Sequence, residues 1–158
     1  MKLTAAVLTI SDSAFRKSRG DLSGPRLQQV LKNSGFEITL SKVLPDEVQQ
    51  IAAALRTAAI QARFVVTTGG TGIAARDVTP EATHRVCDRL LDGVAQLMRV
   101  EGLKQTPFAA LSRGICGTIG TSIVLNLPGN PAGAEQSLKT VLPLISHALD
   151  LLEGKTEH

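Results

Sequence analysis

Short apolar runs alternate along this chain with segments of helical periodicity, and this alternation limits the fold more than any other feature. Four runs have the length and apolar content of strands: residues 3–10, 36–43, 64–68 and 122–127. Three segments repeat apolar residues at the spacing of amphipathic helices: residues 27–31, 48–55 and 138–152. Such alternation is typical of a parallel sheet covered by helices on both faces. The sequence therefore predicts an α/β fold.

The pattern between residues 82 and 120 is less regular. Residues 85–100 are expected to form a helix around Gly93, because their apolar residues keep helical spacing. Residues 106–116 are expected to combine a turn, a short helix and a strand. A chain of 158 residues suits one core, since domains mostly run to about 100 to 200 residues. We therefore expect a single domain over residues 1–158.

Composition and charge exclude several classes of protein. No apolar stretch approaches the roughly 20 residues that span a bilayer, and the first apolar run leads into a polar loop without a cleavage site. We therefore expect a cytoplasmic protein with no membrane partner. The net charge is only +3, the basic residues are spread along the chain, and there are four Phe but no Tyr or Trp for base stacking. These features argue against nucleic-acid binding.

The residues with the most specific chemistry follow the predicted strands. In a parallel sheet these strand exits lie along one edge, the carboxyl edge, where ligands bind in open α/β folds. The exit after residues 36–43 leads to Asp46 at the next helix. Three other helices are expected to begin in the exits with a capping residue followed by proline: Gly24 and Pro25, Thr79 and Pro80, and Asn130 and Pro131.

The third exit, TTGGTG at residues 67–72, has three glycines within four residues. Bare backbone at a strand exit presents N–H groups that bind phosphate, and the threonines add hydroxyl donors. A Walker motif is absent because no lysine follows the glycines. Residues 70–75 match GxGxxA, but a helix start at Thr79 lies too late for a dinucleotide-binding turn. We interpret the glycines as a phosphate cradle of another kind.

Carboxylates in the same exits predict a cation. Four aspartates fall in three exits: Asp12, Asp21, Asp46 and Asp77. Acids beside phosphate repel it unless a cation intervenes, and Mg²⁺ prefers one or two carboxylates with phosphate oxygens and waters. Each acid also has a simpler interpretation: Asp46 can cap a helix, and Asp77 can pair with an arginine or stabilise the turn. Arg76 and Arg113 are expected to take the remaining phosphate charge.

No side chain is placed as an obvious nucleophile. Cys87 and Cys116 lack CxxC spacing and are expected to be reduced, buried thiols. His84 and His147 lie in expected helices with no serine or cysteine partner. Chemistry without a protein nucleophile suits direct phosphoryl or nucleotidyl transfer, in which positioning and charge neutralisation supply most of the rate.

Seven motifs resemble the molybdenum cofactor biosynthesis family, in the family's order and over nearly the whole chain. They are TISDS (9–13), GDLSGP (20–25), LPDE (44–47), TTGGTG (67–72), RDVTPEAT (76–83), LSRG (111–114) and NLPGNP (126–131). The resemblance implies a three-layer α/β/α sandwich with a mostly parallel central sheet, usually a homotrimer. It also implies an enzyme that transfers AMP from Mg·ATP to the terminal phosphate of molybdopterin and releases pyrophosphate, which prepares the product for metal insertion.

The resemblance also assigns residues. Asp46 and Asp77 match the essential acids, which are expected to serve catalysis and to bind Mg²⁺. The residues expected to bind molybdopterin or nucleotide are Ser11, Asp12, Ser23, Gly24, Thr68, Gly69, Gly70, Thr71, Gly72, Arg76, Thr79, Pro80, Glu81, Ser112, Arg113, Pro128, Gly129, Asn130 and Pro131. A transient contact with a molybdate-insertion protein is a further expectation.

Alternatives stay open at this point. A catalytically silent member of the family would bind or carry molybdopterin without releasing pyrophosphate; retention of Asp46 and Asp77 argues against this. Molybdate-insertion proteins and nicotinamide-nucleotide amidohydrolase relatives share the domain but usually carry additional domains. The sequence leaves open which phosphate residues 69–72 hold, and whether the metal inserted later is molybdenum or tungsten.

Overall fold

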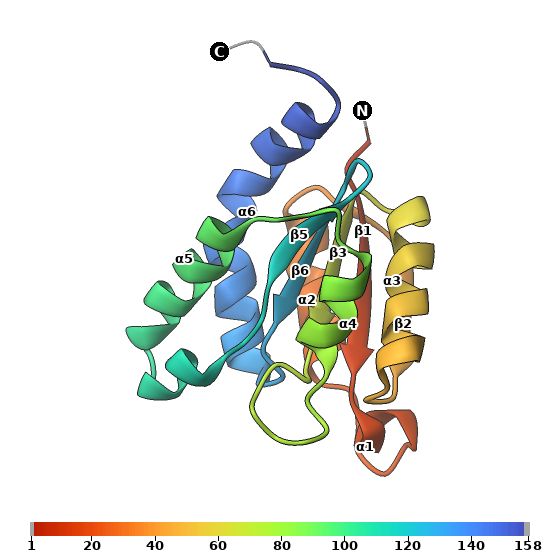
Figure 1. Ribbon diagram of the computed structural model, residues 1–158, viewed down its shortest axis with the longest axis vertical. Helices are drawn as coiled ribbons and strands as arrows, with labels where there is room; N and C mark the ends of the chain where they lie inside the picture. The colour runs from red at the N-terminus through yellow and green to blue at the C-terminus, as the bar shows by residue number, and fades with distance from the viewer. Residues whose placement is uncertain (1, 157–158) are drawn as a thin grey trace.

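The computed structural model describes residues 2–156, which form a central six-stranded sheet flanked by helices (Figure 1). The strand order is β2-β1-β3-β6-β5-β4. The strands β2, β1, β3 and β6 run parallel, whereas β5 is antiparallel to β6 and β4 to β5. Their bounds are β1 Thr4–Ile10, β2 Glu37–Leu44, β3 Phe64–Thr68, β4 Arg89–Leu90, β5 Cys116–Ile119 and β6 Ser122–Leu127.

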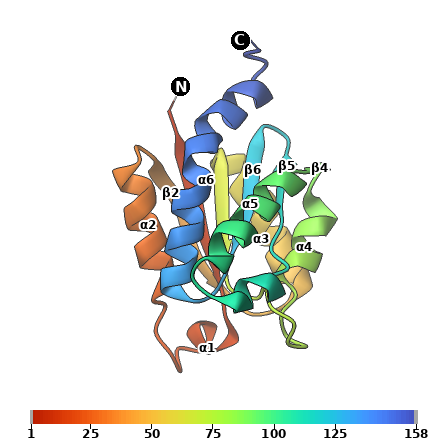
Figure 2. The ribbon, with the colours of Figure 1, turned by 90° about the vertical axis from the view of Figure 1, so that its left-hand side faces the viewer.

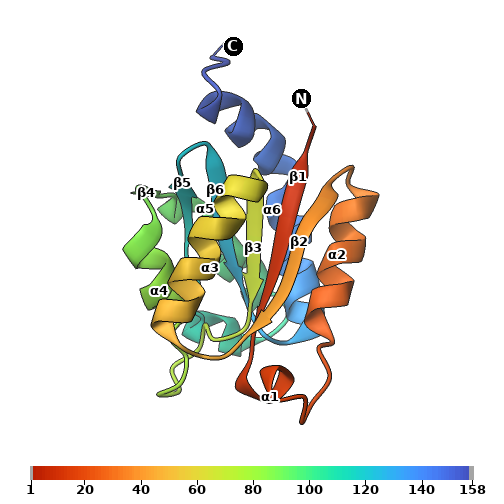
Figure 3. The same cartoon turned by 90° about the vertical axis from the view of Figure 1, so that its right-hand side faces the viewer.

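Helices cover both faces of the sheet. The elements are α1 Asp12–Phe15, α2 Ser23–Asn33, α3 Val48–Gln61, α4 Thr79–Val86, α5 Asp92–Leu103, the 3-10 helix η1 Pro107–Leu111 and α6 Pro131–Leu152. The helices α2, α5 and α6 lie on one face (Figure 2), and α3 and α4 lie on the other (Figure 3). This arrangement confirms the predicted α/β/α sandwich with a mostly parallel sheet.

The core consists of two apolar layers separated by the sheet. Val7 and Val66 face α2 and α6, whereas their chain neighbours Ala6 and Val65 face α3 and α4. Because successive side chains of a strand point to opposite faces and helices cover both faces, the central strands β1, β3 and β6 are buried along nearly their whole length. The edge strand β2 instead alternates between exposed and half-buried residues along most of its length.

The helix predicted over residues 85–100 is confirmed only around Gly93, over residues 92–100. The structure has two helices there, α4 and α5, separated by β4. The chain leaves α4 at Cys87, and Arg89 and Leu90 then pair with Thr118 and Gly117 of β5. Helical periodicity is local, whereas this pairing joins segments far apart in the chain, so the pattern could not reveal it. The prediction for residues 106–116 is confirmed by η1 and the start of β5.

Both cysteines are free thiols, as predicted. Cys116 is buried and Cys87 is half-buried. Burial raises the pKa of Cys87 to about 11 and that of Cys116 to about 12, so neither is a thiolate near neutral pH.

The last helix, α6, is the longest of those described and extends past the amino edge of the sheet (Figure 1). Even so, none of the helices within residues 2–156 combines the length and apolar character needed to cross a bilayer.

Candidate active site

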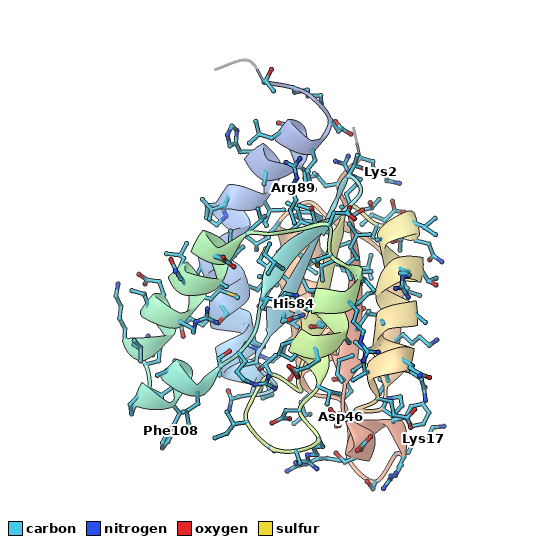
Figure 4. All side chains as sticks on the ribbon, in the orientation of Figure 1. Lys2, Lys17, Asp46, His84, Arg89 and Phe108 are labelled. Carbon is cyan, nitrogen blue, oxygen red and sulfur yellow. The ribbon has the colours of Figure 1, made fainter. Side chains whose placement is uncertain are left out.

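The parallel strands all end at one edge of the sheet, at the bottom of Figure 1. Their exits therefore meet there, as the sequence predicts. Figure 4 labels Asp46 and Lys17 on the right of this lower edge and Phe108 of η1 on its left. The candidate site is formed by the strand exits that lie between Asp46 and Phe108 along this edge.

The glycine turn after β3 has a backbone conformation that other residues rarely adopt. Gly69 has φ +100° and Gly70 has φ +67°. A Cβ atom on Gly69 would lie 2.3 Å from the backbone oxygen of Ile10, and one on Gly70 would lie 2.3 Å from Thr79 Oγ1. Gly129, in the exit of β6, packs closely on Gly69. Glycine is therefore required by both conformation and space.

The turn leaves backbone donors available. The N–H of Gly69 donates to Leu127 O at 3.1 Å. The next three N–H groups, of Gly70, Thr71 and Gly72, make no hydrogen bond to any residue within 2–156. Consecutive unpaired N–H groups in a tight turn form an anion-binding concavity. The turn therefore has the donors that a phosphate cradle needs.

The start of α4 supports the turn rather than being capped by Thr79. The helix begins at Thr79, its N-cap is Val78, and no side chain caps it. The prediction of Thr79 as N-cap is therefore wrong. Its hydroxyl instead donates to Gly69 O at 2.9 Å, and its N–H donates to Gly70 O at 3.1 Å. The start of α4 thus holds the glycine turn by both groups.

Asp12 and Asp46 join the first two exits by reciprocal hydrogen bonds. The N–H of Asp12 donates to Asp46 Oδ2 at 3.0 Å, and the N–H of Asp46 donates to Asp12 Oδ1 at 2.8 Å. Asp46 is not a helix cap, because α3 begins at Val48 after an N-cap at Glu47. Burial is the main cause of the raised pKa of Asp46, and the nearby Asp12 and Asp77 carboxylates add to it. Negative charge is thus concentrated here.

Asp77 stabilises the glycine-rich loop and also faces the site. Its Oδ2 accepts a hydrogen bond from the Ala74 N–H at 3.0 Å, which agrees with the simpler interpretation of a turn residue. The same oxygen would lie 2.8 Å from a Cβ atom on Gly72, so the carboxylate lies directly against the turn. Asp77 also lines the main pocket.

Asp21 has a structural role at the start of α2. Its two oxygens accept from Gly24 N at 2.9 Å and from Thr9 Oγ1 at 2.8 Å. The helix begins at Ser23 after an N-cap at Leu22, so the prediction of Gly24 as N-cap is wrong. The carboxylate of Asp21 satisfies the free N–H of the first turn instead.

The carboxylates fit a Mg²⁺ ion that is completed by a ligand. Within residues 2–156 no group of three or more His, Cys, Asp or Glu side chains is arranged to hold a metal ion. Mg²⁺ does not require such a group, because it commonly takes one or two carboxylates with phosphate oxygens and waters. Asp46 and Asp77 meet this requirement, since each lies against a glycine of the same turn.

Arg113 is a clamp on the glycine-rich loop. Its Nε donates to Gly72 O and its Nη2 to Asp77 O, both at 2.8 Å, while Nη1 donates to Glu81 at 2.7 Å. The bond from Arg113 holds the pKa of Glu81 below its usual value. Most of its donors are therefore used within the protein, and its predicted contact with phosphate stays a prediction. Arg76, in contrast, is exposed near Asp46.

The main pocket, of about 900 Å³, opens between the glycine turn, η1 and the start of α6. Eight of the predicted site residues line it: Gly70, Thr71, Gly72, Asp77, Ser112, Pro128, Gly129 and Asn130. The others are not part of its wall: Ser11, Asp12, Ser23, Gly24, Asp46, Thr68, Gly69, Arg76, Thr79, Pro80, Glu81, Arg113 and Pro131.

Several residues outside the wall hold the loop that follows β6. The hydroxyls of Ser23 and Thr68 donate to Gly129 O and Pro128 O at 2.8 and 2.7 Å. Asn130 is the N-cap of α6, as predicted, with Oδ1 accepting from Gly133 N at 2.9 Å, and Pro131 begins the helix. This part of the site is held by polar contacts from three elements.

Sequence reasoning missed six polar side chains in the pocket wall: Arg99 of α5, Asn126 of β6, and Gln105, Thr106, Gln136 and Ser137. Asn126 lies within the buried strand β6. Arg99 lies in α5, a segment that the sequence analysis recognised only by the helical spacing of its apolar residues. Asn126 belongs to the motif NLPGNP but was assigned no role there, and Arg99 belongs to none of the seven motifs. Only the assembled fold brings them to the carboxyl edge.

Asn126 is the centre of a buried hydrogen-bond network. Its Nδ2 donates to Thr67 Oγ1 and to Thr83 Oγ1, both at 3.0 Å, and its Oδ1 accepts from Ile115 N at 3.2 Å. Thr83 Oγ1 then donates to Thr79 O at 2.8 Å. Because Thr79 holds the glycine turn, the network connects the pocket wall to this turn through α4.

Thr83→Val is expected to destabilise the protein by about 2 kcal/mol, because a buried donor on Asn126 loses its acceptor. Thr140 supplies a matched control. Its hydroxyl makes the same kind of bond to a carbonyl four residues back, at 3.0 Å, but has no asparagine partner. Thr140→Val should therefore change the free energy of unfolding by no more than about 0.5 kcal/mol. Urea denaturation would measure both, and equal losses would contradict the network's importance.

Comparison with known proteins identifies relatives of this chain. A family model described as "Probable molybdopterin binding domain" matches residues 6–147. The molybdopterin adenylyltransferase of Helicobacter pylori (strain ATCC 700392 / 26695) is 40% identical over 153 residues, which cover 94% of this chain and 86% of that protein. The crystal structure of the molybdopterin biosynthesis enzyme MoaB from Thermus thermophilus matches with a TM-score of 0.90 and 45% identity, over 97% of this chain and 98% of the other.

A longer relative has the same domain as one part. The molybdenum cofactor synthesis protein cinnamon of Drosophila melanogaster is 39% identical over 154 residues, which cover 95% of this chain and only 26% of the fly protein. The family model nevertheless spans most of this chain, and the bacterial relatives match it over most of their own length. This chain therefore belongs to the molybdenum cofactor biosynthesis family and has the fold of its MoaB members.

Proposed function

We propose that this protein transfers AMP from ATP to the terminal phosphate of molybdopterin and releases pyrophosphate. One observation carries the proposal. Asp46 Oδ1 lies 3.2 Å from the Cβ position of Gly70, and Asp77 Oδ2 lies 2.8 Å from that of Gly72, so two carboxylates flank one turn with unpaired N–H groups. This arrangement suits a phosphate chain with its cation. The Helicobacter relative, which bears the name of this activity, supports the choice of reaction.

The reaction needs no covalent intermediate on the protein. An oxygen of the molybdopterin phosphate forms a bond to the α-phosphorus of ATP, and the bond from that phosphorus to the bridging oxygen of pyrophosphate breaks. Asp46 and Asp77 would hold Mg²⁺, which supplies positive charge to the leaving pyrophosphate. The N–H groups of Gly70, Thr71 and Gly72 would bind phosphate oxygens in positions fixed before the substrates arrive. Arg113 and Thr79 keep the turn in that conformation.

The direct test is turnover by the purified protein. We expect pyrophosphate and adenylylated molybdopterin to appear in equal amounts when molybdopterin and Mg·ATP are supplied, and neither to appear when EDTA replaces Mg²⁺. Chromatography would quantify both products. Tight binding of molybdopterin with no pyrophosphate release would overturn the proposal and favour the carrier function.

The assembly and location expected from the family are also proposals. We propose a homotrimer in the cytoplasm that passes its product to a molybdate-insertion protein by transient contact. Sedimentation equilibrium at micromolar concentration would test the trimer, and a monomer mass would contradict it.

A further inference from the structure

Arg99 is the one cationic side chain among the described residues that line the main pocket. It lies on α5 directly after Met98, which is buried against the sheet and α6, and is itself half-buried. Among the residues of 2–156 in the pocket wall, the only other charged side chain is Asp77. The remaining wall is formed by glycines and by polar and apolar side chains. Arg99 therefore sets the positive charge inside this pocket.

The guanidinium of Arg99 is anchored at one nitrogen only. Its Nη1 donates to Gly114 O at 3.0 Å and to Ser112 O at 3.4 Å. Within residues 2–156, Nε and Nη2 make no hydrogen bond, and no carboxylate lies within 4.0 Å. Arg113 differs in this respect, because its bonds to Glu81 compensate its charge. Arg113 is thus a clamp on the loop, whereas Arg99 is a cation with unused donors.

Holding the loop of residues 112–114 does not by itself explain an arginine at this position. A neutral donor would satisfy the same two carbonyls, and a half-buried charge without a partner costs free energy. The planar guanidinium suits bidentate binding of phosphate through its Nε and Nη2 edge. The available edge and the missing counter-charge both point to an anionic ligand.

We infer that Arg99 determines the specificity of the pocket by binding a phosphate oxyanion of the ligand. The inference rests on the proposed function for its ligand, and either the phosphate of molybdopterin or the phosphates of ATP would supply this chemistry. The glycine turn offers backbone N–H groups to phosphate, whereas Arg99 offers a full positive charge from α5. A ligand without phosphate would leave that charge unpaired and bind less well.

Equilibrium binding with one substrate at a time tests this without turnover. The probes are ATP against adenosine, and molybdopterin against its dephosphorylated form, measured calorimetrically with Mg²⁺ present. We expect Arg99→Gln to weaken the binding of at least one phosphate-bearing probe by about tenfold or more. The binding of its neutral counterpart should weaken by less than about twofold. Arg99→Lys, which keeps the charge, should lose less. The probe whose affinity falls identifies the source of the phosphate. If the affinities for both ATP and molybdopterin fall, Arg99 contacts the phosphates of both.

Arg56→Gln is the matched control, because Arg56 is exposed on α3 and loses the same charge without touching the pocket. It should leave all four affinities unchanged. The inference is overturned if Arg99→Gln weakens phosphate-bearing and neutral probes equally, weakens none, or if the wild type binds no phosphate-bearing probe. Wild-type binding with an Arg99 effect but no pyrophosphate release would reject only the proposed reaction.

Discussion

Asp77→Asn should lower kcat for pyrophosphate release by about a hundredfold or more, because it removes the negative charge that we propose binds Mg²⁺ and positions the phosphates. The fold should be little affected. The Asn side-chain oxygen can still accept the hydrogen bond from Ala74 N, which the Asp77 carboxylate accepts at 3.0 Å. We therefore expect the melting temperature to change by no more than about 2 °C. Steady-state kinetics and thermal unfolding of the same preparation would measure the two effects.

Glu47 offers a matched control for this change. It is an exposed carboxylate in the β2 exit, next to Asp46 in sequence, and it does not line the pocket. Glu47→Gln should leave kcat within about twofold of the wild type. If Asp77→Asn instead lost stability in proportion to activity, Asp77 would be a turn residue and the site would need another cation ligand.

The central layers of the fold could be predicted because burial on both faces leaves a local signature. The strands β1, β3 and β6 each contain an unbroken run of at least three apolar residues, and α2, α3 and α6 repeat apolar residues at helical spacing. The two-residue strand β4 could not be predicted in the same way. Arg89 and Leu90 are exposed, and they form a strand only because β5 pairs with them. Tertiary pairing decides such elements.

Much of the site could be predicted for a different reason. Parallel strands bring their exits to one edge, so residues as distant as Asp12, Asp46 and Asp77 had to come close. What the sequence could not provide was the partner of each donor. Arg113 and Arg99 are both arginines near the same loop, yet one is used by Glu81 and the other keeps its donors. Only side-chain geometry separates them.

Gly69→Ala is expected to destabilise the protein by about 3 kcal/mol or more and to abolish phosphate binding at the turn. An Ala at φ +100° costs about 1–2 kcal/mol by conformation alone. Its Cβ would also lie 2.3 Å from Ile10 O, a backbone atom of the central strand that cannot move without disturbing the sheet. The melting temperature should therefore fall by roughly 10 °C when it is measured at a fixed protein concentration.

Two other glycines separate these contributions. Gly35→Ala has the conformational cost at φ +90° but open space around its Cβ, so it should lose only about 1–2 kcal/mol. Gly93→Ala, in α5, has neither cost and should gain about 0.5 kcal/mol. A loss at Gly69 no larger than that at Gly35 would mean that the exit of β1 yields to the added methyl group. The glycine would then serve conformation alone, and the close approach of the turn to β1 would not be required for the phosphate cradle.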